Sequence, residues 1–119
     1  MAKNVSVRVR MYRQGLGDCF LLTFTQEDGS VHNMMIDCGL FQQTTNGSKI
    51  MKAVANDLKS ETNSKVDVVA LTHEHWDHIS GFSYAKDIFQ KADFRFEEVW
   101  VGWTENKALL SFDTMKLTA

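Results

Sequence analysis

One short stretch, Thr72-His73-Glu74-His75-Trp76-Asp77-His78, follows an apolar run at residues 66–71 and precedes Ser80-Gly81. It holds three of the four histidines of the chain, with an aspartate between the second and the third. Imidazole nitrogens and carboxylate oxygens are ligands that Zn²⁺, Mn²⁺ and iron ions accept. A histidine-rich surface loop is the alternative interpretation, but this grouping favours a metal site.

The spacing of the ligands supports a metal site. In an extended chain His73 and His75 point to the same side, Asp77 continues that alternation, and His78 points to the opposite side. One metal could therefore take His73 and His75, and a neighbouring metal could take Asp77 and His78. Residues 66–71 read as a buried strand, so the site is expected at the carboxyl end of a strand, facing the start of a helix.

The segments before this stretch predict strands. Residues 5–11 alternate apolar and polar side chains, as in a half-buried strand whose basic residues face solvent. Two further strands, 19–25 and 31–37, flank Asp28-Gly29, which is a strong hairpin signal. A two-residue turn there would place Leu21 opposite Ile36, and Cys19 opposite Cys38. We expect both cysteines to be buried and reduced.

Apolar residues at helical spacing predict packing helices at 48–60 and 80–92, capped by Ser48 and Ser80. A strand at 94–103 and a helix at 104–117 follow. The pattern predicts an antiparallel hairpin that leads into a mixed sheet, with helices on one face. Asp37 ends an apolar strand, where a charge needs partners, although an ordinary turn of the Asp-Gly kind at the strand end is the alternative.

Composition places few limits on function. The 119 residues are 44% hydrophobic and 24% charged, as in an ordinary globular domain, and the net charge of −2 gives no electrostatic footprint for nucleic acid. No apolar run reaches the length of a membrane span, and the first residues lack a signal-peptide core. The expectation is a single domain over 1–119 in the cytoplasm, without membrane partners.

Residues 72–81 resemble the metal-binding signature of the metallo-β-lactamase superfamily. Two more stretches agree with it in order and separation: Gly15-Leu16-Gly17-Asp18-Cys19-Phe20-Leu21-Leu22 and Ile36-Asp37-Cys38-Gly39. Together they resemble the hydrolase domain attached to DNA-uptake competence proteins. The resemblance implies an α+β fold, half of an αββα sandwich, and it covers only the amino-terminal half of such a domain.

For the site, the resemblance implies that one or two zinc ions, or manganese or iron, bind to His73, His75, Asp77 and His78. Asp77 would also orient the nucleophile, and Asp37 and Asp18 would brace the metal-binding loop, although a turn-capping role for Asp18 is equally supported. The family draws further ligands from its second half, and no histidine follows His78 here. The expectation is thus the amino-terminal portion of a longer hydrolase, or a degenerate relative, that alone binds zinc weakly.

Three functions remain open. The first is a metal-dependent hydrolase that uses a metal-activated water on an unknown small-molecule or phosphodiester substrate. The second is a phosphodiesterase or nuclease of the same fold, and the third is a non-catalytic half-domain that binds a partner. Whether this chain alone is an enzyme stays open, because its ligand set is incomplete. Phe20, Leu22 and Phe24 would leave an apolar patch on an uncovered sheet, so self-association or a missing carboxyl-terminal half is expected.

Overall fold

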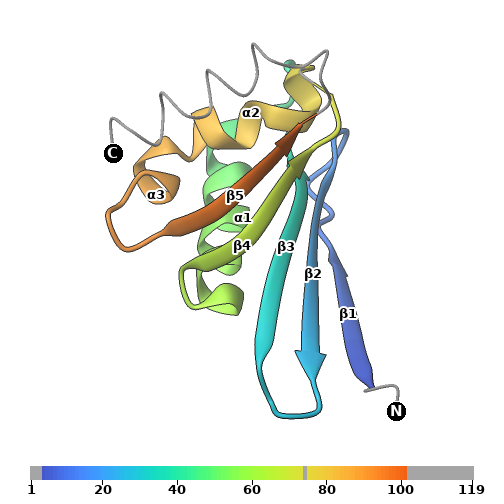
Figure 1. The fold of residues 1–119 in the computed structure, drawn as a ribbon. Helices are drawn as coiled ribbons and strands as arrows, with labels where there is room; N and C mark the ends of the chain where they lie inside the picture. The colour runs from blue at the N-terminus through green and yellow to red at the C-terminus, as the bar shows by residue number, and fades with distance from the viewer. Residues whose placement is uncertain (1–3, 74, 102–119) are drawn as a thin grey trace.

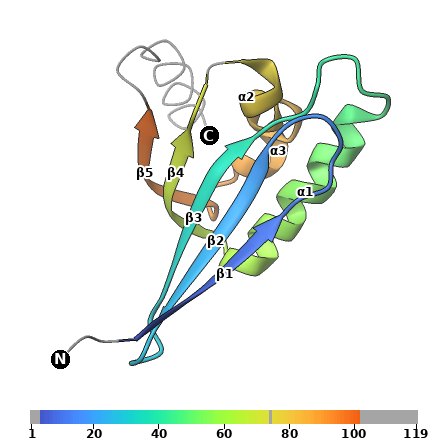
Figure 2. The ribbon, with the colours of Figure 1, turned by 90° about the vertical axis from the view of Figure 1, so that its right-hand side faces the viewer.

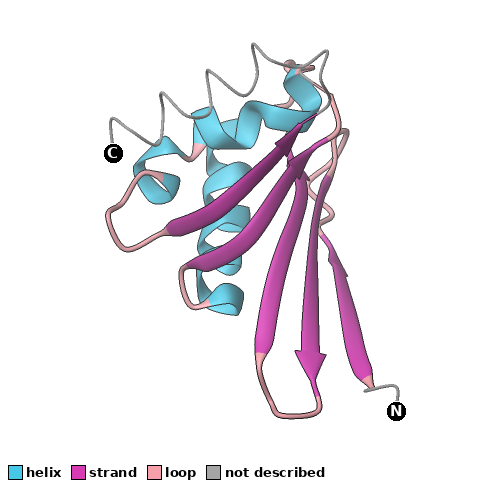
Figure 3. Ribbon diagram, in the orientation of Figure 1, coloured by secondary structure: helices cyan, strands magenta, loops and turns pink. Residues whose placement is uncertain are grey.

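The computed structural model describes residues 4–73 and 75–101, which form one five-stranded sheet and three helices (Figures 1 and 3). In chain order the elements are β1 (Val5–Met11), β2 (Cys19–Gln26), β3 (Val31–Cys38), α1 (Gly47–Thr62), β4 (Lys65–Leu71), α2 (Trp76–Tyr84), α3 (Lys86–Phe89) and β5 (Arg95–Val101). Among these helices, none is long and apolar enough to cross a membrane.

The strands lie in the order β1-β2-β3-β4-β5. The first three are antiparallel, while β4 is parallel to both β3 and β5. Each parallel connection needs a crossover, which α1 provides between β3 and β4 and which α2 and α3 provide between β4 and β5. All three helices lie on the same side of the sheet (Figure 2). The predicted α+β fold, a mixed sheet with helices on one face, is confirmed.

The core lies between the sheet and the helices. Leu21, Met35 and Val69 are register partners across three neighbouring strands, and all three are completely buried. The predicted apolar stripe of α1 packs against this row. The main buried side chains of the helix layer are Met51, Val54, Ala55, Leu58, Phe82, Ile88 and Phe89.

In strand β1 the basic side chains face the helices and the apolar side chains face away from them, which is the reverse of the prediction. Arg8 and Arg10 point toward α1, where Arg8 pairs with Glu61 at 2.7 Å and Arg10 pairs with Asp57 at 2.9 Å. The apolar residues of the strand therefore point away from the helices, and Val9 is 60% exposed. The prediction was wrong because alternation alone does not say which side of a strand faces the core.

The side of the sheet opposite the helices carries apolar residues on all five strands, with Glu98 on β5 as a charged member. One row of register partners runs Met11, Phe20, Ile36, Ala70 and Trp100, and the next runs Val9, Leu22, Met34, Val68 and Glu98. We call these two rows, together with Val5, Val7 and Phe24, the open face. No described helix lies on it (Figure 2). Its exposed members include Val5, Val7, Val9, Met11 and Trp100, each more than half exposed.

The β2–β3 hairpin turns through three residues rather than two. The backbone bonds Gln26 N–H to Ser30 O, at 2.9 Å, and Gly29 N–H to Gln26 O, at 3.0 Å, close a loop of residues 27–29. Gly29 has φ +86°, as expected for the last residue of a three-residue hairpin loop. Leu21 therefore faces Met35, not Ile36 as predicted. A bulge between Cys19 and Phe20 then restores the predicted Cys19–Cys38 pair.

The two cysteines are free and buried, as predicted. A hydrogen bond with Cys38 and burial of the thiol raise the pKa of Cys19 well above its usual range. Both effects disfavour the Cys19 thiolate, so Cys19 is an unreactive core side chain.

The helix boundaries differ from those predicted. Helix α1 begins after Asn46, which has φ +60°, so Ser48 lies inside the first turn. The predicted second helix is two helices that meet at Ala85, whose φ of −108° and ψ of +31° interrupt the helical path. Helix α2 begins at Trp76, and Ser80 is buried within it. Ser80 is therefore not a cap: its hydroxyl bonds the backbone of Leu40. The helix predicted at 104–117 lies outside the described residues.

Candidate metal centre

Four segments meet at one edge of the sheet, at the upper end of the view in Figure 1. Strand β2 is antiparallel to β3, so β2 begins where β3 ends, and β4 ends at the same edge because it is parallel to β3. This topology brings Asp18, Asp37 and Thr72 together, although they are far apart in sequence. Helix α2 starts a few residues after β4 and places His78 beside them.

The three neighbouring histidines converge. The ring centroids of His73 and His78 lie 4.8 Å apart, those of His73 and His75 lie 5.7 Å apart, and those of His75 and His78 lie 6.5 Å apart. His73 and His75 are exposed, so their rings are accessible to solvent. The fourth histidine, His32, lies near the tip of the hairpin and approaches Asp67 at 3.7 Å.

Asp77 belongs to the same group. Its Oδ2 atom lies 3.8 Å from Nε2 of His78, and its side chain is 43% exposed. The edge therefore presents three imidazoles beside the partly exposed carboxylate of Asp77, a donor set that suits a zinc ion or a similar divalent metal. The donor chemistry fits the metal that the sequence predicted.

Asp37 lies underneath this group and is 2% exposed. Its Oδ1 atom accepts a hydrogen bond from the backbone N–H of Thr72 at 2.7 Å. Its Oδ2 atom accepts one from the Thr72 hydroxyl and one from Nδ1 of His78, the latter at 2.8 Å. Because His78 uses Nδ1 to reach Asp37, its Nε2 atom is left to face Asp77 and a ligand.

The pKa of His78 is shifted by burial and by the carboxylates around it. Burial lowers the pKa of His78, but the hydrogen bond that His78 donates to Asp37 and the charges of Asp37, Asp77 and Asp18 outweigh it and raise the pKa above the usual value. Asp18 contributes through its Oδ2 atom, 3.4 Å from Nδ1 of His78. In the absence of a metal, these carboxylates thus favour a protonated His78.

A second possible ligand group consists of Asp18, Asp37 and His78. One donor atom from each of these residues lies within 4.8 Å of the others. Both carboxylate oxygens of Asp37 already accept hydrogen bonds, however, and a metal at this position would have to displace them. The contacts therefore favour a bracing arrangement, in which the metal lies on the Nε2 side of His78.

Two glycines let the start of α2 lie directly on the β2 and β3 termini. A Cβ atom added to Gly39 would overlap the carbonyl of Asp77, and one added to Gly17, which has φ +141°, would lie 2.9 Å from the same carbonyl. That carbonyl also accepts a hydrogen bond from Asp18 N–H at 3.2 Å. This packing role of the two glycines could not be predicted from the sequence, because the contact joins segments about 40 and 60 residues apart.

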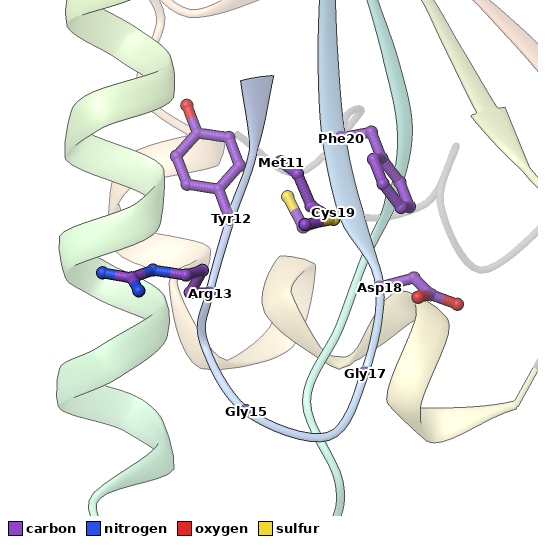
Figure 4. Close-up of a pocket in the computed structure, with 8 residues that line it drawn as sticks. All are labelled: Met11, Tyr12, Arg13, Gly15, Gly17, Asp18, Cys19 and Phe20. Carbon is purple, nitrogen blue, oxygen red and sulfur yellow. The ribbon is translucent and has the colours of Figure 1, made fainter. Parts of the chain in front are cut away.

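The turn before β2 borders an open pocket of about 370 Å³ (Figure 4). Its lining is largely apolar, and Asp18, which belongs to that lining, also approaches His78. In Figure 4 the side chains of Tyr12 and Arg13 point toward the side on which α1 lies, whereas Phe20 and Asp18 point the other way. The lining residues are Met11, Tyr12, Arg13, Gly15, Gly17, Asp18, Cys19 and Phe20.

Later carboxylates in the described part of the chain lie away from this edge. Asp87 pairs with Lys52 at 3.6 Å, and Asp93 pairs with Lys59 at 3.0 Å. Both lysines belong to α1, so these aspartates form exposed ion pairs on the helix layer. Within residues 4–73 and 75–101, neither of them adds a ligand to the group.

Residues 12–116 match the family model described as the metallo-beta-lactamase superfamily, which is most of the 119-residue chain. Comparisons with curated proteins and with solved structures gave no match.

Proposed function

The chain belongs to the metallo-β-lactamase superfamily, and from this membership and the geometry of the edge site we propose that it is the metal-binding part of a metal-dependent hydrolase. The observation that carries the proposal is the convergence of His73, His75 and His78 beside Asp77, with Asp37 bonded beneath them. Solvated histidines in an unconstrained loop have no need of a buried carboxylate that fixes one ring by its Nδ1 atom.

Each side chain has a proposed role. His73 and His75 hold one metal, Asp77 and the Nε2 atom of His78 hold a neighbouring one, and zinc is the ion that this donor set suits best. When bound, such ions supply a water of lowered pKa and stabilise negative charge on the substrate. Asp77 also orients that water, while Asp37 and Asp18 keep His78 in position.

The proposal includes a second layer on the open face. A catalytic zinc site normally has three protein ligands and an open position, but the spacing of this group offers two ligands for each of two metals. A parallel strand such as β4 is normally covered on both faces. We infer that a second sheet-and-helix layer covers the open face and contributes further ligands at the same edge.

Zinc calorimetry on this chain tests the metal site. We expect weak binding, because a two-ligand site leaves most coordination positions to water. His75→Ala should abolish that binding, and His32→Ala, a matched change at an exposed histidine outside the group, should leave it unchanged. Equal zinc binding by the native and His75→Ala chains would overturn the proposed site.

Turnover tests the hydrolase assignment separately. A phosphodiester and a lactam are suitable probes, and any turnover should require added metal and be lost in Asp77→Asn. The net charge of −2 gives no reason to prefer a nucleic-acid substrate. Zinc binding that depends on His75, without turnover even when the open face is covered, would favour a non-catalytic partner-binding domain instead.

A further inference from the structure

Thr72 stands between the buried carboxylate and the first histidine. Its hydroxyl oxygen lies within hydrogen-bond distance of Oδ2 of Asp37, and 3.0 Å from Nδ1 of His73. Its backbone N–H also bonds Asp37, at 2.7 Å, which fixes the position of the residue. Thr72 itself has no place in the metal-ligand set, so these contacts require a different explanation.

The Thr72 hydroxyl contacts both Asp37 and His73, and only one placement of the hydrogen atoms satisfies both contacts. A carboxylate oxygen can only accept, so the single hydroxyl hydrogen of Thr72 is donated to Asp37. The hydroxyl oxygen then has only lone pairs to offer His73. Nδ1 of His73 must therefore carry the hydrogen and donate it, which leaves Nε2 of His73 as the unprotonated, metal-binding nitrogen.

We propose that Thr72 is a positioning residue, through which Asp37 sets the tautomer and ring orientation of His73. Asp37 acts on His78 directly at 2.8 Å and on His73 through the Thr72 hydroxyl. One buried carboxylate thus orders two histidines that the site presents to metal by their Nε2 atoms. The metal-binding consequence rests on the proposed function, whereas the tautomer itself is a property of the metal-free chain.

Nitrogen-15 NMR of the imidazoles in the metal-free chain tests the tautomer directly, at a pH where the rings are neutral. In the native chain His73 should carry its hydrogen on Nδ1. Thr72→Val keeps the side-chain shape but removes the hydroxyl, so His73 should shift toward the Nε2–H form. Thr72→Ser should retain the native signature. Thr25→Val, the same change on β2 away from the site, should not alter the His73 signals.

Zinc calorimetry on the same variants gives the second readout. Loss of such a supporting hydrogen bond typically costs 10–100-fold in metal affinity, so we expect a loss of that order in Thr72→Val and recovery in Thr72→Ser. An unchanged His73 tautomer in Thr72→Val would overturn the inference, whatever the zinc affinity. A shifted tautomer in a chain that binds no zinc would support the role of Thr72 and count against the proposed metal site instead.

Discussion

At the scale of the residue, Asp37 organises the site. It is buried, has φ +55°, and receives hydrogen bonds from Thr72 and from His78. Aspartate and asparagine tolerate a left-handed backbone better than other non-glycine residues. An aspartate at this position therefore tolerates the left-handed backbone and also supplies the oxygen atoms that accept these hydrogen bonds. The sequence indicates this role in part, since a charge at the end of an apolar strand needs partners.

The identity of those partners could not be predicted from the sequence. Thr72 and His78 lie 35 and 41 residues from Asp37, and only the strand order brings them to the same edge. The four metal-ligand candidates were predictable because they occur within six residues. The hydroxyl of Thr72 was not recognised, because its contacts with Asp37 and His73 become visible only when the end of β3 is placed beside the end of β4.

Asp37→Asn tests the bracing role. Asparagine keeps the left-handed backbone accessible, but it loses the charge and offers one acceptor oxygen in place of two. We expect a 10–100-fold loss of zinc affinity, together with a loss of about 1–3 kcal/mol in the free energy of unfolding. Calorimetry and denaturant unfolding measure the two effects. Asp67→Asn, at a carboxylate outside the site, is the control, and unchanged zinc binding in Asp37→Asn would contradict the role.

The raised pKa of His78 predicts two opposite dependences on pH. A proton on His78 must leave before a metal binds, so zinc affinity should increase as the pH rises through that pKa. The stabilising interaction of protonated His78 with Asp37 in the metal-free chain should be present in full below about pH 6.5, and should be lost as the pH rises through the raised pKa.

NMR titration of His78 measures its pKa, and unfolding at several pH values measures the stability. In Asp37→Asn the pKa of His78 should fall, because burial then acts with less opposition. The loss of stability caused by Asp37→Asn should therefore be greater at pH 6 than at pH 9. A pKa at or below the usual histidine value in the native chain would refute the stability dependence, and would place the rise in zinc affinity at a correspondingly lower pH.

At the scale of the element, α2 is fixed to the sheet by close backbone contact. Sequence periodicity predicted the helix but placed its start at Ser80, four residues too late. Ser80 resembles a cap by residue type, yet its hydroxyl is buried against Leu40. The proposed metal ligands Asp77 and His78 are therefore in the first turn of the helix rather than in a loop.

The β2–β3 hairpin shows that a turn can be located from the sequence while the register of its strands is missed. Asp28-Gly29 correctly located the turn, but the loop has three residues instead of two. The register therefore shifted by one, and the bulge at Cys19 shifted it back before Cys38. The predicted cysteine pair was right because these two offsets cancel. The bulge adjoins Asp18, so the irregular part of the strand lies at the site and not at the tip of the hairpin.

Gly39→Ala tests the contact between α2 and the sheet. The new methyl group would overlap the backbone carbonyl of Asp77, and a backbone atom cannot move aside cheaply. We expect a loss of about 1–3 kcal/mol in the free energy of unfolding, and weaker zinc binding because Asp77 and His78 are displaced. Gly47→Ala is the matched control, since its nearest neighbours are side-chain atoms at 3.4 Å. Equal stability of the two variants would show that the contact is not restrictive.

At the scale of the whole molecule, the two sides of the sheet are apolar but only one is covered by described helices. On β1 the contrast is direct: arginines pair with acidic residues of α1, while valines point to the open face. In a sheet with one solvated face, the apolar side chains usually point to the core and the polar side chains point to water. The pattern is that of a sheet inside a sandwich, and it agrees with membership of a superfamily whose fold was predicted to be αββα.

The open face is large enough to support association. Five strands at about 4.8 Å spacing and seven residues at about 3.3 Å rise give roughly 550 Å² per copy. Two copies face to face would bury about 1,100 Å², just above the roughly 1,000 Å² that a specific interface needs. We therefore expect the 119-residue chain, when nothing else covers the open face, to self-associate at micromolar concentration.

Sedimentation of the native chain and of a Val7→Lys, Val9→Lys double variant tests this expectation. Both valines are at least half exposed, so their replacement should change the free energy of unfolding by less than about 0.5 kcal/mol each. The charges should nevertheless disfavour apolar contact and leave the variant monomeric. Ala53→Lys, an exposed position on α1, should associate like the native chain. A native chain that stays monomeric would mean that the open face is stable in water, and the argument for a second layer would then rest on the ligand count alone.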